Sequence, residues 1–336
     1  MSVPSMTSDP AHRLGIALIG CGRMGERLAQ AVARRADCRL LWCVDRDLEA
    51  ARELADQFEG SQADDDVESL LYRSQIEAVL IATRPDSHAR LVAAAARAGK
   101  HVFVEAPLAI KLPDALHAHA AVREAGVVAG VDFALRAASG VRLVRSAVPG
   151  PHTIEVRATV DSLADRWEGE AEHGGVLGTF GSHALDMAVY LAGSRPLRVY
   201  GAGGRYVRRS GLPDTLTATI KFASGGVAQV VVGEFGTPEG GGAYRGSLND
   251  GVRRAELWSD FTEARVFESE RMVAETPGPA GGHDASDAML GAFVDAVRGG
   301  ARPVADITDG VRAVQLADGL YESMRLGRAV DLEREA

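Results

Sequence analysis

A glycine-rich segment, Gly20-Cys-Gly-Arg-Met-Gly25, carries the first candidate for chemistry in this chain. It follows an apolar run and precedes a stretch with the spacing of an amphipathic helix. Gly20 permits a tight turn, Gly22 lets the backbone approach a pyrophosphate, and Gly25 lets the helix pack closely on the strand. The first amides of the helix then face the anion, with the positive end of the helix dipole behind them. The segment predicts a dinucleotide site, whose contacts we expect to include Arg23 and Met24.

A carboxylate stands at the spacing that such a site requires. A second apolar run, residues 40–44, ends in Asp45, which comes 20 residues after Gly25. At that place a carboxylate would accept hydrogen bonds from the adenosine ribose. Asp45 favours NAD because its charge repels the 2′-phosphate of NADP. The neighbouring Arg46 could bind that phosphate, so NADP is the alternative cofactor.

A histidine is the second candidate for chemistry. His183 lies near the start of a predicted helix over 180–191, and a neutral imidazole can take the proton of an alcohol as its hydride leaves. Thr179 comes four residues earlier and Asp186 three residues later, so the three share one helical face if the helix extends that far. We interpret His183 as the general acid/base, with the Thr179 hydroxyl as a partner of its ring. The alternative is a histidine held in the core at a helix start.

The elements that must position the glycine segment alternate between strand and helix. The predicted strands are 14–19, 40–44, 77–82, 101–104 and 127–131, and the predicted helices are 26–33, 47–58, 67–72, 87–98 and 113–124. This alternation predicts a doubly wound parallel sheet covered on both faces, which is an α/β Rossmann domain. Ligands bind beyond the carboxyl ends of such strands. Thr83, Arg84, Glu105 and Ala106 should therefore line the same crevice as the glycines.

The pattern changes after about residue 133. The predicted strands 152–160, 197–201, 215–222, 227–234 and 256–258 are joined in part by short turns, which favours antiparallel hairpins. Two helices, 285–297 and 307–326, close the chain. We expect a disordered tail over 1–13, a Rossmann domain over 14–133, and an α+β domain over 134–336 that includes the C-terminal helices.

Composition limits the partners of the protein. The 336 residues carry a net charge of −9, which argues against a nucleic-acid partner. No apolar run approaches the roughly 20 residues that span a bilayer, so no membrane partner is expected. Three cysteines, an odd number, suggest reduced thiols in a cytoplasmic protein. His117 and His119 would point to different faces of their helix, and no metal site is expected.

Several segments, taken in order, resemble the Gfo/Idh/MocA family of NAD(P)-dependent sugar and cyclitol oxidoreductases. The matching segments are 20–25, 81–85 with His88, 98–109, 174–186, 293–298, 309–312 and 321–323. The resemblance implies an N-terminal Rossmann domain and a second domain with a largely antiparallel sheet, whose outer face commonly forms homodimers or homotetramers. It places Thr83, Arg84, His88 and Glu105 at the cofactor, and Ala106, Arg136, Thr179 and Asp186 at the substrate. Pairing of Arg136 with a carboxylate across the domain junction is the alternative for that residue.

Two positions depart from the family pattern. The family usually has Glu-Lys-Pro where this chain has Glu105-Ala106-Pro107, and its lysine reaches the nicotinamide ribose and the substrate hydroxyl. It also has an aspartate at the position of Thr179. The changes remove one positive and one negative group from the same pocket, so they can compensate each other. Lys100 lies too early in its strand to replace the lysine, and Lys111 is a weak substitute.

These observations predict an NAD-dependent oxidoreductase that transfers a hydride between nicotinamide and a small-molecule substrate. The substrate would be a sugar, polyol, cyclitol or related carbonyl compound. One alternative is a redox-neutral enzyme with tightly bound NAD that performs elimination, epimerisation or glycoside cleavage. Another is a catalytically silent NAD-binding sensor.

Overall fold

The chain forms two compact units, each with its own sheet. The computed structural model describes residues 12–160, 173–207, 211–234, 236, 243–277 and 285–332. Unit 1 comprises residues 1–109, 113–133 and 286–311, and unit 2 comprises 110–112, 134–285 and 312–336. The predicted tail over 1–11 lies outside the described residues. The last two residues assigned to that tail, His12 and Arg13, form hydrogen bonds with Glu77 and with the carbonyl of Cys38.

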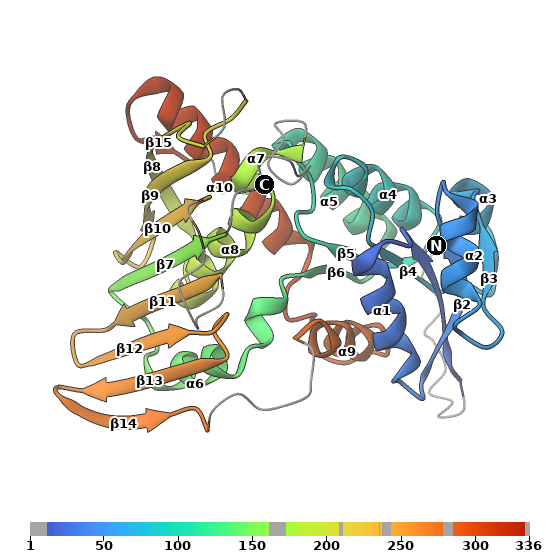
Figure 1. The fold of residues 1–336 in the computed structure, drawn as a ribbon, viewed down its shortest axis with the longest axis horizontal. Coiled ribbons are helices and arrows are strands. Elements are labelled where there is room, and N and C mark those ends of the chain that lie inside the picture. Colours follow the sequence, from blue (N-terminus) through green and yellow to red (C-terminus); the bar gives the residue numbers. More distant parts are fainter. Residues whose placement is uncertain are drawn as a thin grey trace. The chain divides into compact units, whose positions relative to one another are not determined.

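Unit 1 is built on a six-stranded parallel sheet in the order β3-β2-β1-β4-β5-β6. Its strands are β1 (Leu14–Ile19), β2 (Cys38–Val44), β3 (Gln62–Asp64), β4 (Ala78–Ile81), β5 (His101–Glu105) and β6 (Ala129–Asp132). The helices between them are α1 (Arg23–Ala33), α2 (Leu48–Ala55), α3 (Val67–Leu71), α4 (Pro85–Arg97) and α5 (Leu112–Ala125). Every residue of β1, β4 and β6 is buried, as expected for a parallel sheet with both faces covered. The predicted Rossmann architecture is confirmed (Figure 1).

Local chemistry explains where these helices begin. The carboxylates of Asp47 and Asp66 accept hydrogen bonds from the first free amides of α2 and α3, which satisfies donors that have no partner within the helix. Helix α4 begins at Pro85, two residues before the predicted start, because proline suits the first helical position, where its missing N–H costs nothing.

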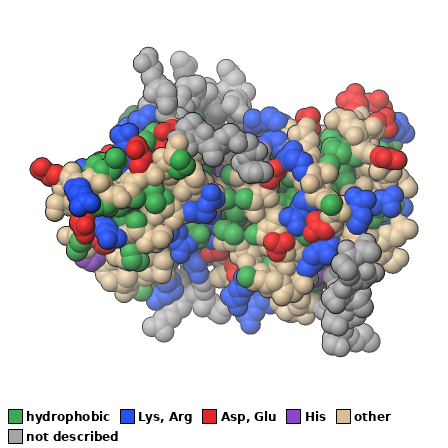
Figure 2. Space-filling view, turned by 90° about the horizontal axis from the view of Figure 1, so that it is seen from below, with side chains coloured by type: hydrophobic (Ala, Val, Ile, Leu, Met, Phe, Trp, Pro, Cys, Tyr) green, Lys and Arg blue, Asp and Glu red, His purple; other side chains and the backbone are tan. Residues whose placement is uncertain are grey.

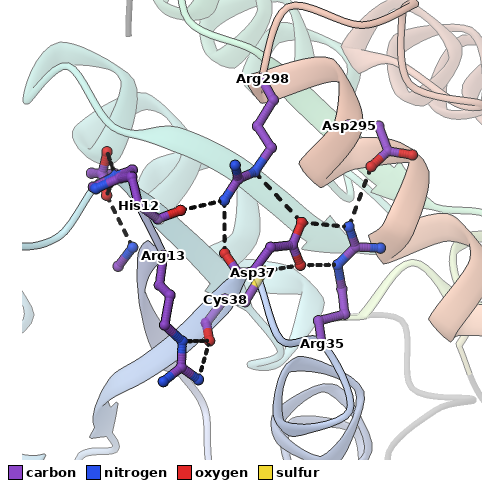
Figure 3. A network of polar contacts seen from close by, with 9 residues as sticks. His12, Arg13, Arg35, Asp37, Cys38, Asp295 and Arg298 are labelled. Atoms are coloured by element: carbon purple, nitrogen blue, oxygen red, sulfur yellow. Dashed lines mark hydrogen bonds and ion pairs between the residues drawn. The ribbon is translucent and has the colours of Figure 1, made fainter. Parts of the chain in front are cut away.

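A helix from the C-terminal part of the chain belongs to unit 1, contrary to the single boundary expected at residue 133. Helix α9 (Ala285–Val297) is tied to the edge of unit 1 by a network of arginines and carboxylates (Figure 3). Arg35 bonds Asp37 and Asp295, and Arg298 donates to the carbonyls of His12 and Asp37. Contacts between residues some 260 positions apart in sequence carry no local signal, so pattern reasoning placed this helix with its sequence neighbours.

Unit 2 contains a nine-stranded sheet in the order β14-β13-β12-β11-β7-β10-β9-β8-β15. All neighbours are antiparallel except β7 and β10, which confirms the predicted, largely antiparallel α+β domain. The strands are β7 (Thr153–Thr159), β8 (Pro196–Gly204), β9 (Thr215–Phe222), β10 (Val227–Gly233), β11 (Tyr244–Asn249), β12 (Arg253–Trp258), β13 (Glu263–Glu268), β14 (Arg271–Glu275) and β15 (Val330–Asp331). The helical segments are η1 (Ala134–Ala137), α6 (Ser139–Ala147), α7 (Gly175–Gly178), α8 (Phe180–Ala192) and α10 (Ile307–Leu326), of which α10 belongs to unit 2 only from Arg312 onward.

Burial alternates along the central strands of unit 2, so one face of the sheet forms the core. In β7 and β9 the inward side chains are buried, whereas the outward ones are polar and mostly exposed. Helix α8 packs on the inner face against β7 and β10. Strands β11, β13 and β14 were not predicted from the sequence, because polar residues, and in β11 an internal glycine, hide the alternation of apolar residues.

The face seen in Figure 2 carries both basic and acidic side chains, scattered over the described residues. Within the described part of the chain, no helix combines the length and the apolar character needed to cross a bilayer.

Candidate active site

The glycine turn, residues 20–25, has the geometry of a phosphate-binding loop. Gly20 has φ of +99°, and a Cβ there would lie 2.5 Å from the carbonyl oxygen of Ala82. A Cβ on Gly25 would lie 1.9 Å from the carbonyl oxygen of Gly20. A Cβ on Gly22, by contrast, would meet nothing within 4 Å, and no side chain caps the helix that starts at Arg23. Tight packing at two glycines and open space at the third fit a pyrophosphate seated on the free amides of α1.

Asp45 follows β2 beside this turn. Its carboxylate accepts hydrogen bonds from the N–H of Cys21 at 2.8 Å and of Asp47 at 3.1 Å, which fixes it against the backbone of the turn. Arg46 is exposed next to it. The side chain that should meet the ribose is therefore held at the glycine turn, where the spacing of the sequence predicted it.

The thiol of Cys21 lies within the glycine turn. A hydrogen bond with the Cys43 thiol and burial together raise the pKa of Cys21 well above its ordinary value. Because the thiolate is the reactive form of cysteine, this thiol is a poor nucleophile at neutral pH. The three cysteines are free thiols.

Thr83, Arg84 and His88 lie at the start of α4, at the end of β4. Arg84 is exposed, and the Thr83 hydroxyl bonds that of Ser87 at 2.6 Å. His88 is completely buried, with Nδ1 2.7 Å from the carbonyl of Pro107 and Nε2 3.0 Å from the carbonyl of Thr83. Burial lowers its pKa. The sequence predicted that His88 contacts the cofactor. In the structure both ring nitrogens face protein carbonyls, and His88 joins the segments after β4 and β5.

Buried carboxylates accompany the Glu105-Ala106-Pro107 motif. Glu105 ends β5 and is paired in register with Asp132, which ends β6; their exposed fractions are 8% and 1%. Sequence reasoning missed Asp132, although a carboxylate directly after an apolar strand is the same signal that identified Asp45. Ala106 supplies no charge at this place.

Neither nearby lysine replaces the missing one from a comparable position. The Lys100 ammonium donates to the carbonyls of Arg73 and Ile76, at the opposite end of β5. Lys111 belongs to unit 2, is exposed, and lies near Asp318; burial raises the pKa of Asp318, and the charge of Lys111 opposes that rise.

In unit 2, His183 lies in the first turn of α8, as predicted. The side chain is half-buried, and burial lowers its pKa to about 4. Its ring meets the edge of Tyr244, with 6.2 Å between the ring centroids. Tyr244 comes from β11, a strand that the sequence did not reveal. At neutral pH the imidazole of His183 is neutral and can accept a proton.

Thr179 precedes α8, and its predicted contact with the ring of His183 stays a prediction. Helix α8 begins only at Phe180, and Thr179, with φ of −111° and ψ of −112°, connects it to α7. The Thr179 hydroxyl donates to the carbonyl of Gly175 at 3.0 Å. Its only proton is therefore used by the backbone, and the residue does not share a helical face with His183.

Arg136 and Asp186 form a buried ion pair with each other. Arg136 donates from Nε at 2.8 Å and from Nη2 at 2.5 Å, and the two side chains are 4% and 3% exposed. The guanidinium also lies 4.4 Å from the centre of the Tyr190 ring. Arg136 thus has a carboxylate partner within its own unit. The predicted contact of both side chains with the substrate stays a prediction.

Metal chemistry has no evident site among the described residues, where no group of three His, Cys, Asp or Glu side chains is arranged to hold an ion. His117 accepts a hydrogen bond from Arg97 at 2.7 Å.

Comparison with known proteins extends these observations. The Gfo/Idh/MocA oxidoreductase family with an NAD-binding Rossmann fold matches residues 14–133, and the C-terminal domain of the same family matches 141–241. The myo-inositol 2-dehydrogenase of Thermotoga maritima is 24% identical over 95% of this chain and 98% of its own length. An uncharacterized oxidoreductase of Bacillus subtilis, YrbE, is 28% identical, and the match spans 63% of this chain and just under two thirds, 65%, of that protein.

A solved structure has the same fold along nearly the whole chain. The NAD binding oxidoreductase from Klebsiella pneumoniae covers 96% of this chain and 100% of its own, with a TM-score of 0.87 at 21% identity. Since the two domain matches together cover well over half of the sequence, the chain belongs to the Gfo/Idh/MocA family of oxidoreductases, whose N-terminal domain is an NAD-binding Rossmann fold.

Proposed function

We propose that this protein is an NAD-dependent dehydrogenase that transfers a hydride between nicotinamide and a hydroxyl-bearing carbon of a sugar, polyol or cyclitol. The observation that carries the proposal is the open space at Gly22, beside a carboxylate, at the start of an uncapped helix. Relatives of the chain support the substrate class, because their names include scyllo-inositol 2-dehydrogenase and D-glucoside 3-dehydrogenase.

The residues of unit 1 would hold the cofactor. The amides at the start of α1 would bind the pyrophosphate, and Asp45 would bind the ribose hydroxyls. The bound nicotinamide supplies the hydride acceptor or donor. Arg46 would decide how well the 2′-phosphate of NADP is tolerated.

His183 would handle the proton of the substrate hydroxyl. In the oxidation direction its neutral ring accepts the proton as the hydride leaves, and in reduction the protonated ring returns it. A pKa of about 4 keeps the ring neutral at pH 7, which suits the oxidation direction. No cation at residue 106 assists the ionisation of the hydroxyl.

The absence of a lysine at residue 106 favours a second candidate function. An enzyme that keeps NAD bound could oxidise its substrate transiently and perform an elimination, epimerisation or glycoside cleavage without net redox change. In that case NAD(H) would copurify with the protein and remain bound during turnover.

The assembly and the compartment also remain part of the proposal. We infer a homodimer or homotetramer formed by the outward face of the nine-stranded sheet, working in a reducing cytoplasm where its three cysteines stay thiols.

The test is to purify the protein, identify any bound nucleotide, and follow NADH formation with inositols, glucosides and ketoses. His183→Ala should lower kcat by about 10²–10⁴-fold without weakening NAD binding, whereas His152→Ala, which removes an exposed histidine of the same unit, should change neither. A protein that binds neither NAD nor NADP would overturn the proposal. Turnover without net NADH formation would favour the redox-neutral candidate, and tight NAD binding without turnover would favour a sensor.

A further inference from the structure

The segment that leads into the helix of His183 has little stiffness of its own. Gly174 and Gly175 have φ of +86° and +61°, in the left-handed region, and α7 is a single helical turn that ends at Gly178. Glycine loses more backbone freedom on folding than any other residue. This segment therefore needs contacts from elsewhere in the chain to keep one conformation. We call residues 174–183 the histidine turn.

One hydroxyl group from α10 contacts two backbone groups of the histidine turn. Tyr321 donates to the carbonyl of Gly174 at 2.9 Å and accepts from the N–H of Leu177 at 3.3 Å. Burial raises the pKa of Tyr321, so the phenol keeps the proton that it donates. A Cβ on Gly175 would lie 2.9 Å from this hydroxyl, so the glycine is what admits it.

Further hydrogen bonds connect the backbone groups that Tyr321 contacts with the first turn of α8. The Gly174 carbonyl also accepts from the N–H of Gly178 at 3.0 Å, and Thr179 bonds the Gly175 carbonyl. Ser182, next to His183, donates through its hydroxyl to the carbonyl of Thr179 at 2.6 Å. A Cβ on Gly181 would lie 2.4 Å from the carbonyl of Val176, so α7 and α8 are packed in direct backbone contact.

The first turn of α8 also has a contact from the sheet. Tyr244 of β11 donates its hydroxyl to the carbonyl of Phe180 at 2.8 Å, and its ring meets that of His183. With the sheet side fixed in this way, a displacement of α7 would change the orientation of His183 relative to Tyr244.

The geometry points to Tyr321 as a positioning residue for His183: its hydroxyl clamps the glycine-rich turn before α8 and so sets where the imidazole lies. The inference rests on the proposed function, in which His183 handles the substrate proton. Tyr321 touches neither substrate nor cofactor in this role. It acts through the backbone of residues 174–179.

Tyr321→Phe removes the hydroxyl and keeps the ring, and Ser323→Ala provides a matched control on the same helix. Ser323 is fully buried, whereas Tyr321 is partly buried, and Ser323→Ala removes two hydrogen bonds, from the Gly201 N–H and to the Arg328 carbonyl, neither of which involves the histidine turn. We expect Tyr321→Phe to lower kcat about 10- to 100-fold, the scale of a misplaced catalytic group, with NAD affinity unchanged. Ser323→Ala should leave kcat unchanged.

The deciding measurement is the titration of the His183 ring by NMR, with its signal assigned from a His183→Gln variant. Loosening of the turn should admit water and move the pKa of His183 up from about 4 toward its ordinary value of 6.5 in Tyr321→Phe but not in Ser323→Ala. Thr179→Val removes the hydrogen bond to the Gly175 carbonyl and should shift the pKa of His183 in the same direction. This variant provides the test if Tyr321→Phe does not fold. If the pKa of His183 is unshifted in both Tyr321→Phe and Thr179→Val, the inference is overturned, whatever the effect on kcat.

Failure of the proposed function has a different signature. If His183→Gln keeps full activity, His183 is not the general acid/base, but a shifted ring titration in Tyr321→Phe would still establish the clamp.

Discussion

The glycine turn of unit 1 and the histidine turn of unit 2 both consist of glycines that lead into a helix, yet different groups satisfy them. The open space at Gly22 and the uncapped start of α1 leave the first amides of that helix for a ligand. The histidine turn is instead filled by its own protein, through the hydroxyls of Tyr321 and Thr179. A turn that leaves N–H donors for a ligand can be predicted from the local spacing of residues. A turn whose backbone groups bond other parts of the protein depends on residues far away in sequence, such as Tyr321.

The largest effect on stability should come from breaking the ion pair between Arg136 and Asp186, the latter in the helix into which the histidine turn leads. Asp186→Asn removes the charge that Asp186 places against the buried Arg136 guanidinium, and loss of one partner of such a pair costs about 3–5 kcal/mol. Urea unfolding of unit 2 measures this loss. The double change Arg136→Met with Asp186→Leu should recover much of the stability, and a double variant as unstable as the single one would contradict this account.

Alanines placed in the glycine turn should separate packing from ligand space. Gly25→Ala meets the Gly20 carbonyl and should destabilise unit 1 by about 1–3 kcal/mol while abolishing NAD binding. Gly22→Ala should leave the melting temperature unchanged and weaken NAD alone, because its Cβ enters only open space. Calorimetry with and without NAD provides both measurements, and equal destabilisation by the two alanines would refute the assignment.

Restoring a lysine at residue 106 tests whether the reaction depends on the cation that the family pattern usually has there. Ala106→Lys should raise the rate of NADH formation by roughly 10²-fold if the missing charge limits hydroxyl ionisation. Steady-state kinetics on the substrate found for the native protein measure it, with Ala106→Met as a control for chain length without charge. No gain from the lysine would show that the native site does not depend on that cation.

Removing the charge of Asp45 should change the choice of cofactor. The amides of Cys21 and Asp47 bond different oxygens of the carboxylate, so Asp45→Asn keeps one of these two hydrogen bonds and loses the other. We expect a folded protein whose preference for NAD over NADP falls by about tenfold, equivalent to roughly 1.4 kcal/mol. Titrations with both nucleotides give the ratio. An unchanged ratio would move the specificity to Arg46.

A further effect concerns the pH dependence of stability. The pKa of His183 is about 4 in the folded protein and 6.5 ordinarily, so the unfolded chain takes up a proton first as the pH falls. The contribution of the neutral ring is fully present above pH 6.5 and is lost between pH 6.5 and 4. His183→Gln should therefore flatten the fall of the melting temperature over that interval, whereas His152→Gln should not. A parallel fall in wild type and His183→Gln would contradict the lowered pKa.

The parts of the molecule that could be predicted are those that depend on residues close together in sequence. One strand-turn-helix-strand unit contains Gly20, Gly22, Gly25 and Asp45, so their relative positions follow from chain geometry. The predicted Rossmann architecture is confirmed. The placement of α9 could not be predicted, because its ion pairs join residues about 260 positions apart. For Thr179, the assumption of a continuous helix failed where the chain breaks between α7 and α8.

The sequence by itself determined the Rossmann domain, the family, the cofactor class and the location of His183 at a helix start. Only the tertiary structure decided what each polar side chain contacts: His88 between two carbonyls, Arg136 on Asp186, and Tyr321 on the histidine turn. The physical reason is that a spacing specifies which backbone element a residue occupies. The partner of a buried polar group is chosen by the free-energy cost of leaving it unsatisfied, and that partner can come from any part of the chain.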